Sequence, residues 1–368
     1  MWINPIGKLY WNPVFLMGLG IIAFLSGHAQ PVNQTSFEDL GDSALFTLES
    51  WQKEGFTVPW VDGFDQERAY VDKHYAHSGD HSLRIFYPKG GFGPSQTGAQ
   101  APLQVPPASQ YYISYWLRFD EQFSWGTTSE GGKLPGLAGG QNCSGCTTCT
   151  GSNGFSARLM WRTGGKAVLY LYNMDKKATC GDDYSLTTAN GDFYFQKGKW
   201  HHVTERVKVN TGTNHDGEVE VWMDGQQAVL VTGLEFVSNG DKVDNLYFST
   251  FHGGSTADWA PVNDCYIWFD DVVISIHPED VFSSSSLQNG VDTNASFDIS
   301  PQPAVAGSSL FLKGVHASSC EVMDESGKII QEVQVTDGKM MMPKVKPGVY
   351  LLRFWQNGQS YVKKMMVE

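Results

Sequence analysis

Four polar side chains with different chemistries occupy alternate positions of two neighbouring strand-like segments. The segments span residues 155–162 and 166–173, and Thr163-Gly164-Gly165 joins them as a three-residue hairpin loop. Because successive side chains of a strand point to opposite faces, one face of each segment is apolar and the other is polar. A hydroxyl, a guanidinium and two phenols then form one compact patch: Ser156, Arg158, Tyr170 and Tyr172.

The register of this hairpin decides whether the patch forms. A three-residue loop places Arg158 opposite Tyr170, with their Cβ atoms roughly 5 Å apart. A two-residue turn at Gly164-Gly165 would instead pair Arg158 with Leu171 and send the polar groups to opposite faces. We favour the longer loop, because only its register keeps the apolar side chains of both segments on one side.

A lysine in a glycine-rich stretch precedes the hairpin. The run Gly131-Gly132-Lys133-Leu134-Pro135-Gly136 predicts a loop whose backbone approaches its neighbours closely. An amphipathic hairpin with outward-facing tyrosines is by itself ordinary. However, residues 131–174 contain no Asp or Glu, in a chain of formal net charge −13. Their cations therefore predict a site for an anion: Lys133, Arg158, Arg162 and Lys166.

These motifs resemble polysaccharide lyase family 14, whose alginate and glucuronate lyases have a β-jelly-roll fold. The resemblance is carried by Gly-Gly-Lys-Leu-Pro-Gly-Leu-x-Gly-Gly, by Phe-Ser-Ala-Arg-Leu-Met-Trp-Arg and by Tyr-Leu-Tyr, and it extends more loosely from Leu45 to Ser275. It implies five catalytic residues, which are Lys133, Ser156, Arg158, Tyr170 and Tyr172.

The reaction that this resemblance implies is β-elimination in a uronic-acid polymer, either alginate or glucuronan. The C6 carboxylate charge must be offset, a base must take the C5 proton, and an acid must protonate the departing O4. We expect Arg158, with Lys133 beside it, to offset the carboxylate. We expect Tyr170 and Tyr172 to transfer the protons, since neighbouring cations favour a phenolate. Lys133 as the proton shuttle, assisted by Ser156, is the alternative; neither route needs a metal or another cofactor.

Further side chains are expected to contact the substrate. Gln100 lies in the run Gly98-Ala99-Gln100-Ala101, and His252 precedes two glycines. Arg118 belongs to the alternating segment Tyr111–Asp120, which we expect in the concave sheet. The expected substrate-binding residues are Gln100, Arg118, Arg162 and His252.

Other functions compete with the lyase. A non-catalytic sugar-binding sandwich would hold an anionic polysaccharide on the same patch. A glycoside hydrolase needs two carboxylates flanking the bond, and later segments could supply them from Glu218, Glu220 or Asp224. The adjacent Asp270 and Asp271 could alternatively join a structural calcium site.

The composition favours an all-β protein, because aromatic residues make up 13% of the chain and glycine occurs 40 times. We expect a concanavalin-like β-jelly-roll catalytic domain at residues 30–280. A linker at 281–297 and a small immunoglobulin-like β-sandwich at 298–368 would follow.

Six cysteines bear on the loop that precedes the hairpin. Four of them, Cys143, Cys146, Cys149 and Cys180, could form a zinc site. In an exported chain disulfides are the better interpretation, since a loop rich in Ser, Gly and Thr buries little apolar surface. All three pairings stay open, and we expect Cys265 and Cys320 to be free.

Both ends of the chain predict export. Residues 1–29 carry Lys8, an apolar run at 14–25 and a small-residue ending, which is the anatomy of a signal peptide. That run is shorter than the ~20 residues of a membrane-spanning helix. The segments 345–354 and 362–367 resemble the C-terminal sorting domain of the type IX secretion system of Bacteroidetes, with an immunoglobulin-like accessory module as the alternative. We expect a secreted or cell-surface protein whose partners are an anionic polysaccharide and the secretion machinery, with no membrane span in the mature chain and no nucleic-acid partner.

Overall fold

The computed structural model describes residues 33–282, 298–314, 317–324, 329–356 and 359–368. The predicted signal peptide lies outside these residues, as do positions 283–297 of the predicted linker. The first two linker positions instead end the short helix α2 (Pro278–Phe282). Within the described ranges, no helix is both long and apolar enough to cross a membrane.

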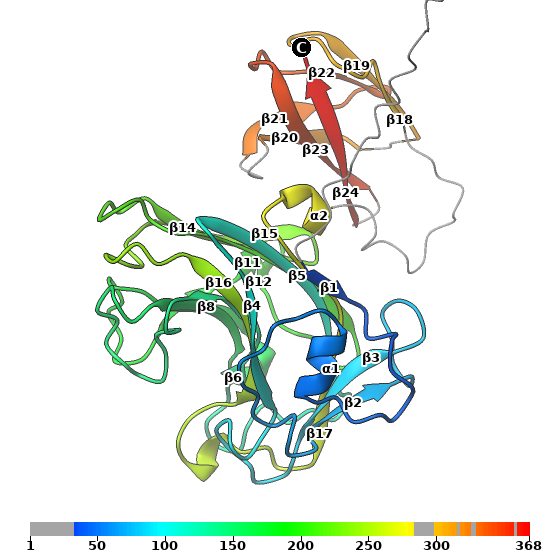
Figure 1. Cartoon of the computed structure of the whole chain (residues 1–368). Helices are drawn as coiled ribbons and strands as arrows, with labels where there is room; N and C mark the ends of the chain where they lie inside the picture. Colours follow the sequence, from blue (N-terminus) through cyan, green and yellow to red (C-terminus); the bar gives the residue numbers. More distant parts are fainter. Residues whose placement is uncertain (1–32, 283–297, 315–316, 325–328, 357–358) are drawn as a thin grey trace, which may run out of the picture. The chain divides into compact units, whose positions relative to one another are not determined.

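Two antiparallel sheets form the body of residues 33–282 and enclose one apolar core, which confirms the predicted all-β sandwich (Figure 1). We call them the β5 sheet and the β8 sheet, after a central strand of each. In strand order, the β5 sheet contains β15 (Gln226–Leu234), β14 (Gly217–Met223), β13 (Trp200–Lys208), β5 (Gln110–Phe119), β17 (Cys265–Ser275), β3 (Ser82–Tyr87) and β2 (Ala69–Asp72), and β1 (Asn33–Thr35) pairs with β17.

The β8 sheet carries the predicted hairpin. In strand order it contains β10 (Asp182–Ser185), β9 (Ala167–Tyr172), β8 (Phe155–Trp161), β6 (Gly132–Lys133), β16 (Val243–His252) and β4 (Ala99–Ala108), and β7 (Gly136–Gly139) pairs with both β16 and β8. The short elements of this region are α1 (Leu48–Lys53), η1 (Thr163–Gly165), β11 (Thr187–Thr188), β12 (Gly191–Asp192) and η2 (Ala257–Trp259).

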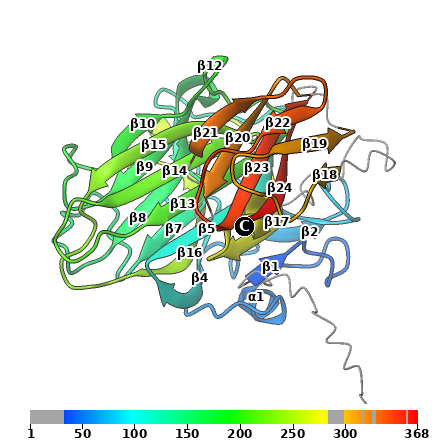
Figure 2. The same ribbon diagram turned by 90° about the horizontal axis from the view of Figure 1, so that it is seen from above.

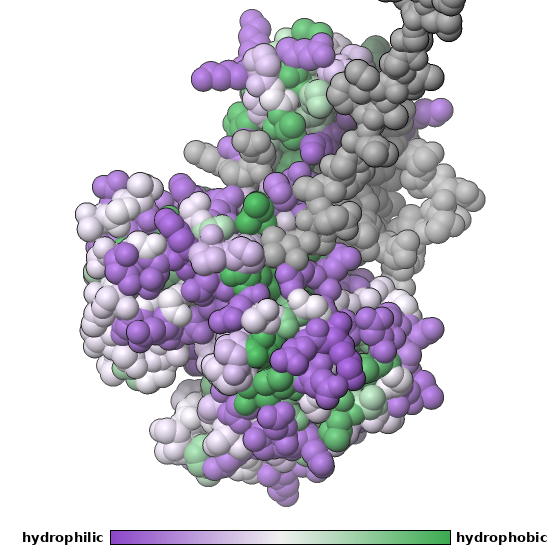
Figure 3. Space-filling model, in the orientation of Figure 1, coloured by the Kyte–Doolittle hydropathy of each residue, from purple (hydrophilic) through white to green (hydrophobic). Residues whose placement is uncertain are grey.

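The core between the sheets is filled by the apolar face of each strand. Leu159 and Leu169 of the β8 sheet and Ile113 of the β5 sheet are fully buried in it. Trp51 of α1 joins them, and removing apolar area from water contributes roughly 25 cal/mol per Å². Large apolar side chains are therefore mostly internal, and the face shown in Figure 3 is largely hydrophilic with small apolar patches.

The hairpin has the predicted register. Ser156 lies opposite Tyr172 and Arg158 opposite Tyr170, and the three residues of η1 form the connection. Gly164 adopts a φ of 67°, which a residue without Cβ tolerates best, and this bend lets the strands pair without a slip. Strands β8, β9 and β10 run side by side in Figure 2, so four of the predicted side chains belong to one sheet.

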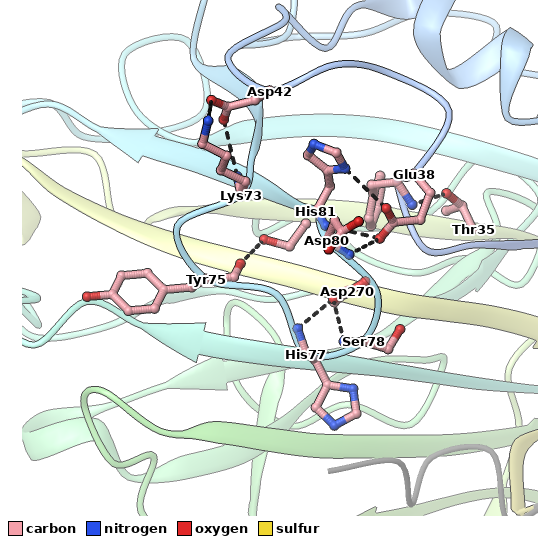
Figure 4. Close-up of polar contacts among 12 residues, drawn as sticks. Thr35, Glu38, Asp42, Lys73, Tyr75, His77, Ser78, Asp80, His81 and Asp270 are labelled. Carbon is pink, nitrogen blue, oxygen red and sulfur yellow. Dashed lines mark hydrogen bonds and ion pairs between the residues drawn. The ribbon is translucent and has the colours of Figure 1, made fainter.

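A buried carboxylate holds the turn between β2 and β3. Asp270 of β17 accepts hydrogen bonds from the backbone N–H groups of His77, at 2.7 Å, and Ser78, at 3.2 Å (Figure 4). Burial, together with the adjacent Asp271, raises the pKa of Asp270 to about 8. The described partners of Asp270 are backbone N–H groups, so this carboxylate anchors the turn to β17, and the calcium site stays a prediction.

Residues 298–368 form two further sheets around a core of their own, which includes Leu310, Val322 and Leu352. Cys265 and Cys320 are free among the described residues, as predicted, and both are buried. The first sheet contains β18 (Asp298–Ser300), β19 (Ser309–Lys313) and β22 (Lys339–Met341), and the second contains β21 (Ile329–Gln334), β20 (Ser319–Asp324), β23 (Gly348–Gln356) and β24 (Gln359–Val367).

Candidate active site

Lys133 lies on a strand, not in the predicted loop. Strand β6 runs between β8 and β16, and Lys133 pairs with Met160 of β8. Glycine is required beside it, because a Cβ on Gly132 would lie 2.0 Å from the ring of Trp161. The pairing brings the Lys133 Nζ to 3.9 Å from the centre of the Tyr170 ring and to 3.0 Å from the Met160 Sδ.

The polar face of the hairpin lines an open cleft of about 1030 Å³. Loop residues 144–146 and 180–181, and residues 182–184 of β10, also line it. The lining side chains that matter below are Gln100, Lys133, Arg158, Met160, Arg162, Tyr170, Tyr172, Asp183 and Tyr247. The cleft therefore gathers most of the predicted site residues.

The two tyrosines form a hydrogen-bonded pair whose hydroxyls are held by backbone amides. Their Oη atoms are 3.2 Å apart. The N–H of Gly181 donates to Tyr170 Oη at 3.0 Å, and the N–H of Cys146 donates to Tyr172 Oη at 2.9 Å. A disulfide between Cys146 and Cys180 joins the two loops that supply these amides. The loops thus fix both phenols from the same side.

Disulfides staple the loop before the hairpin, as predicted. The structure selects one of the three open pairings, Cys143–Cys149 together with Cys146–Cys180. Ser156 is fully buried beneath this loop, and its Oγ donates to the Cys143 carbonyl oxygen at 2.9 Å. Ser156 is therefore next to the tyrosines in the sheet but does not line the cleft.

Arg158 is 2% exposed and makes no ion pair within the described part of the chain. Its Nη1 donates to Ser249 Oγ at 3.2 Å, and its guanidinium carbon lies 5.1 Å from the centre of the Tyr247 ring. The Gln100 Oε1 accepts from the hydroxyls of Tyr247, at 2.9 Å, and Ser249, at 3.1 Å. Gln100 therefore supports the arginine through two shared neighbours.

Burial moves the pKa values of Lys133 and Tyr170 in opposite directions. Desolvation, and then the positive charges of Arg158 and Arg162, hold the pKa of Lys133 well below its usual value. Desolvation, reinforced by the hydrogen bond with Tyr172, raises the pKa of Tyr170. The expectation that nearby cations favour a phenolate is wrong for Tyr170, because burial outweighs the charge of Arg162. Neutral forms of both groups are thus favoured.

Carboxylates from later strands pair with two of the four cations of residues 131–174. Asp183 of β10 accepts two hydrogen bonds from Arg162, from Nε at 2.8 Å and from Nη2 at 2.7 Å. Asp192 of β12 pairs with Lys166 at 2.6 Å. Arg162 therefore lines the cleft as half of an ion pair. Lys133 and Arg158 also line the cleft, and neither has a carboxylate partner among the described residues.

Arg118 was expected in the cleft, and the structure places it elsewhere. Strand β5 belongs to the other sheet, between β13 and β17. The Arg118 guanidinium lies 3.9 Å from the centre of the Tyr75 ring and forms an ion pair with Glu121. Alternation within a strand predicts faces but not sheet membership, so the concave-sheet assignment of this segment was wrong.

His252 was also expected at the cleft, and the structure places it in the interior. It is fully buried, stacks on Phe123 with ring centres 5.6 Å apart, and its Nδ1 lies 2.9 Å from the Trp259 carbonyl oxygen. Burial lowers the pKa of His252 to about 4, so the ring is neutral at neutral pH. On β16 the cleft face belongs to the odd-numbered positions, and His252 points the other way.

The cleft also contains residues that the sequence analysis missed. Tyr247 and Phe251 of β16 line it, as does Met160 of β8. Period-2 alternation along residues 243–252 would have placed Tyr247 and Ser249 on one face. Alternation does not show that this face is the cleft face. That follows from the position of β16 between β4 and β6, which brings Ser249 to Arg158.

The two glutamates considered for a hydrolase form ion pairs on the β5 sheet. Glu218 and Glu220 lie on β14 of the β5 sheet, and both form ion pairs with Arg206. The cleft itself is lined by Asp182 and Asp183. Asp182 accepts backbone hydrogen bonds from residues 177 and 178, while Asp183 is bound to an arginine. This arrangement does not supply a free pair of carboxylates.

Among the described residues, one group has spacing suited to a metal ion. Asp175, His215 and Glu235 have ligand atoms within 4.8 Å of one another. The His215 ring nitrogens lie 3.2 Å from an Asp175 oxygen and 3.6 Å from a Glu235 oxygen, and none of the three residues lines the cleft. The group therefore has no part in the candidate site.

Comparisons with known proteins identify the family and the fold. A family model described as Polysaccharide lyase 14 matches residues 75–272, which is just over half of the chain. No match was found among curated protein sequences.

Solved structures of alginate lyases share the fold. The alginate lyase Aly36B is 25% identical with a TM-score of 0.57, over 67% of this chain and 98% of that one. The marine PL-14 alginate lyase from Aplysia kurodai is 28% identical with a TM-score of 0.55, over 67% of this chain and 99% of that one. A double variant of Aly36B, with a lysine and a tyrosine changed to alanine, was solved in complex with an alginate tetrasaccharide. It is 24% identical with a TM-score of 0.57, over 67% of this chain and 98% of that one. This similarity shows the fold alone. The chain therefore belongs to polysaccharide lyase family 14 and is a polysaccharide lyase with a β-jelly-roll fold.

Proposed function

We propose that this lyase cleaves alginate or glucuronan by β-elimination in the cleft of the β8 sheet. The observation that carries the proposal is the position of the Lys133 amine, 3.9 Å from the centre of the Tyr170 ring, in a cleft that also holds a buried arginine without an ion pair. A buried guanidinium without an ion pair, such as that of Arg158, is costly for the folded protein unless an anion arrives to pair with it. A uronate carboxylate is such an anion.

Arg158 is proposed to bind the C6 carboxylate of the sugar. Within the described protein, the Arg158 guanidinium donates one hydrogen bond, to Ser249. Its other N–H groups are therefore available to a ligand. A guanidinium matches the two oxygens of a carboxylate in geometry and charge. Neutralising the carboxylate lowers the cost of removing the C5 proton.

Lys133 and Tyr170 are proposed to move the protons. The neutral amine of Lys133 takes the proton from C5, the C4–C5 double bond forms, and the bond from C4 to O4 breaks. Tyr170, kept as a phenol by burial, protonates O4. The proton then returns from the Lys133 ammonium to the Tyr170 phenolate, with Tyr172 as the hydrogen-bonded neighbour of that phenol. This assignment moves Lys133 from offsetting charge to accepting the proton, because its pKa is lowered.

Ultraviolet absorbance tests the proposal, because elimination leaves a conjugated unsaturated uronate. Absorbance should rise when the protein is mixed with alginate or glucuronan, and it should stay flat for Lys133→Ala and Tyr170→Phe. Arg84→Ala is the matched control, since Arg84 lies on the β5 sheet and pairs with Asp72. A flat trace for the unmodified protein on all polyuronates would instead favour a non-catalytic binding sandwich.

Export is proposed for both ends of the chain, with residues 1–29 as a signal peptide and residues 298–368 as a type IX sorting domain. The separate core of the C-terminal sheets supports an independent module. The test compares the full chain with one ending at residue 282, both produced in a bacterium that has this secretion system. Loss of lyase activity from the medium only for the shorter chain supports sorting, and equal secretion contradicts it.

A further inference from the structure

A second cavity continues the cleft past Tyr247. It has a volume of about 530 Å³, and it shares the side chain of Tyr247 and residue Ser144 with the catalytic cleft. An exposed tryptophan, Trp60, stands in its wall. A polymer chain leaving the cleft in this direction would pass directly from one cavity to the other.

Tyr247 forms the shared wall, and it is held in place from several directions. Its hydroxyl donates to Gln100 at 2.9 Å, and its ring lies 5.1 Å from the Arg158 guanidinium carbon. On the other side, the Trp60 ring meets it edge-on, with centres 6.3 Å apart. The site for the reacting sugar and the Trp60 cavity are therefore neighbours across one side chain.

Trp60 is 42% exposed, although its segment is firmly attached to the sheet. Backbone hydrogen bonds tie Asp62 to Gln100 in both directions, at 2.9 and 2.7 Å, and the N–H of Gln104 donates to the Thr57 carbonyl at 2.9 Å. The segment thus follows strand β4 on both sides of Trp60. An exposed indole on a fixed backbone loses little entropy when it binds a flat apolar surface.

The polar lining of the two cavities differs in charge. The cleft is lined by Lys133 and Arg158, whereas none of the described residues lining the second cavity is a lysine or arginine. Its polar side chains are mainly amides, together with one carboxylate: Gln104, Gln141, Asn142, Asn245 and Asp244. Amides bind sugar hydroxyls, but they do not neutralise a uronate.

We propose that the Trp60 cavity is an outer subsite for a further sugar of the same polysaccharide. The C–H face of that sugar stacks on the indole, and its hydroxyls bind the amides, without an ion pair to its carboxylate. Trp60 lies outside residues 75–272, which match the family model, whereas most of the other residues lining the cavity lie within them. The inference rests on the proposed function, because it deepens the substrate recognition of the same cleft.

The test measures kcat and KM by ultraviolet absorbance for Trp60→Ala on uronate oligomers of defined length. For long oligomers, KM should rise about 3- to 10-fold with kcat unchanged, which is the size of one lost aromatic stacking contact. The shortest oligomer that the unmodified enzyme cleaves should show no change. Trp60→Phe should recover part of the lost affinity. Because no cation is involved, the KM ratio between variant and unmodified enzyme should not depend on salt.

Tyr194→Ala is the matched control, since Tyr194 is 48% exposed and lines a different cavity. It should leave KM unchanged at every length. Equal effects of Trp60→Ala on short and long oligomers, or no effect at all, would overturn the subsite while leaving the lyase proposal intact. If the unmodified protein yields no unsaturated product from any polyuronate, the proposed function itself fails.

Discussion

Two buried arginines, one on each sheet, have the same burial and opposite surroundings. Arg206 of β13 is 3% exposed and binds Glu218 at 2.7 Å and Glu220 at 3.1 Å. Although burial acts to lower its pKa, the two carboxylates raise it overall. Arg158 of β8 is 2% exposed, its described neighbours are hydroxyls and phenols, and burial lowers its pKa.

This difference separates a structural cation from a functional one. A buried charge that is paired inside the protein has no capacity left for a ligand. A buried charge that lacks an internal partner costs stability, and such a cost is typical of a site that binds an opposite charge. Lys133 also lacks a carboxylate partner among the described residues and faces the same cleft, but desolvation and the charges of Arg158 and Arg162 favour its neutral amine.

The largest effect is expected for Lys133→Met. The change removes the proposed base, so kcat should fall about 10²- to 10⁴-fold. It also removes a desolvated amine, so the free energy of unfolding at neutral pH should rise. Activity assays and denaturant unfolding on the same samples measure both quantities.

The pH dependence of the free energy of unfolding gives a second test of Lys133→Met. The pKa of Lys133 is lowered in the folded protein, so between that value and the usual pKa of lysine the unfolded chain carries an extra proton. The stability of the unmodified protein should therefore approach that of Lys133→Met as the pH rises towards ~10.4. A variant that is less stable than the unmodified protein at pH 7 would place Lys133 among the structural cations.

The two arginines themselves provide the next test. Arg158→Met should lower kcat/KM about 10²- to 10³-fold, as expected when a donor to transition-state charge is lost, and should leave the fold stable. Arg206→Met leaves Glu220 buried without its cation, so the free energy of unfolding should fall by about 3–5 kcal/mol. Its activity per folded molecule should not change. Similar losses of activity in both variants would remove the distinction between the sheets.

The Cys146–Cys180 disulfide should have an intermediate effect. Replacing both cysteines by alanine frees the two loops whose amides bind Tyr170 and Tyr172. Misplacing the phenols should lower kcat about 10²-fold with less change in KM. The matched control replaces the other disulfide, which lies within a single loop, and should cost less kcat. Equal losses in the two variants would show that the bridges act only through general stability.

The sequence predicts the hairpin well, because its information is local. The alternation along residues 155–173 and the three-residue loop determine the register, so the positions of Arg158 and Tyr170 follow without knowledge of the rest of the fold. The same rule fails for Arg118, since alternation cannot say which sheet a strand joins. It also fails for Lys133, whose strand exists only because β8 and β16 lie on either side of it.

Long-range pairing accounts for the remaining differences. Asp183 neutralises Arg162 from a position 21 residues away, and Cys180 closes a bridge over 34 residues. Neither partner can be chosen from spacing alone. Ser156 keeps its predicted place in the sheet, whereas its burial and its hydrogen bond to the Cys143 carbonyl depend on the disulfide-stapled loop, which alternation along the strand does not predict.

The smallest effect is expected at the cleft cation that does have a partner. Arg162 and Asp183 form a partly exposed pair at the cleft, which predicts little contribution to catalysis. Arg162→Gln should raise KM about 2- to 3-fold, whereas Asp183→Asn frees the guanidinium for the polyuronate and should lower KM by a similar factor. Both shifts should vanish at high salt, because the pair is open to solvent, and kcat should stay constant. A drop in kcat of about 10²-fold for Arg162→Gln would instead place Arg162 with Arg158 in the proposed catalytic group, since that is the loss expected when transition-state charge goes unstabilised.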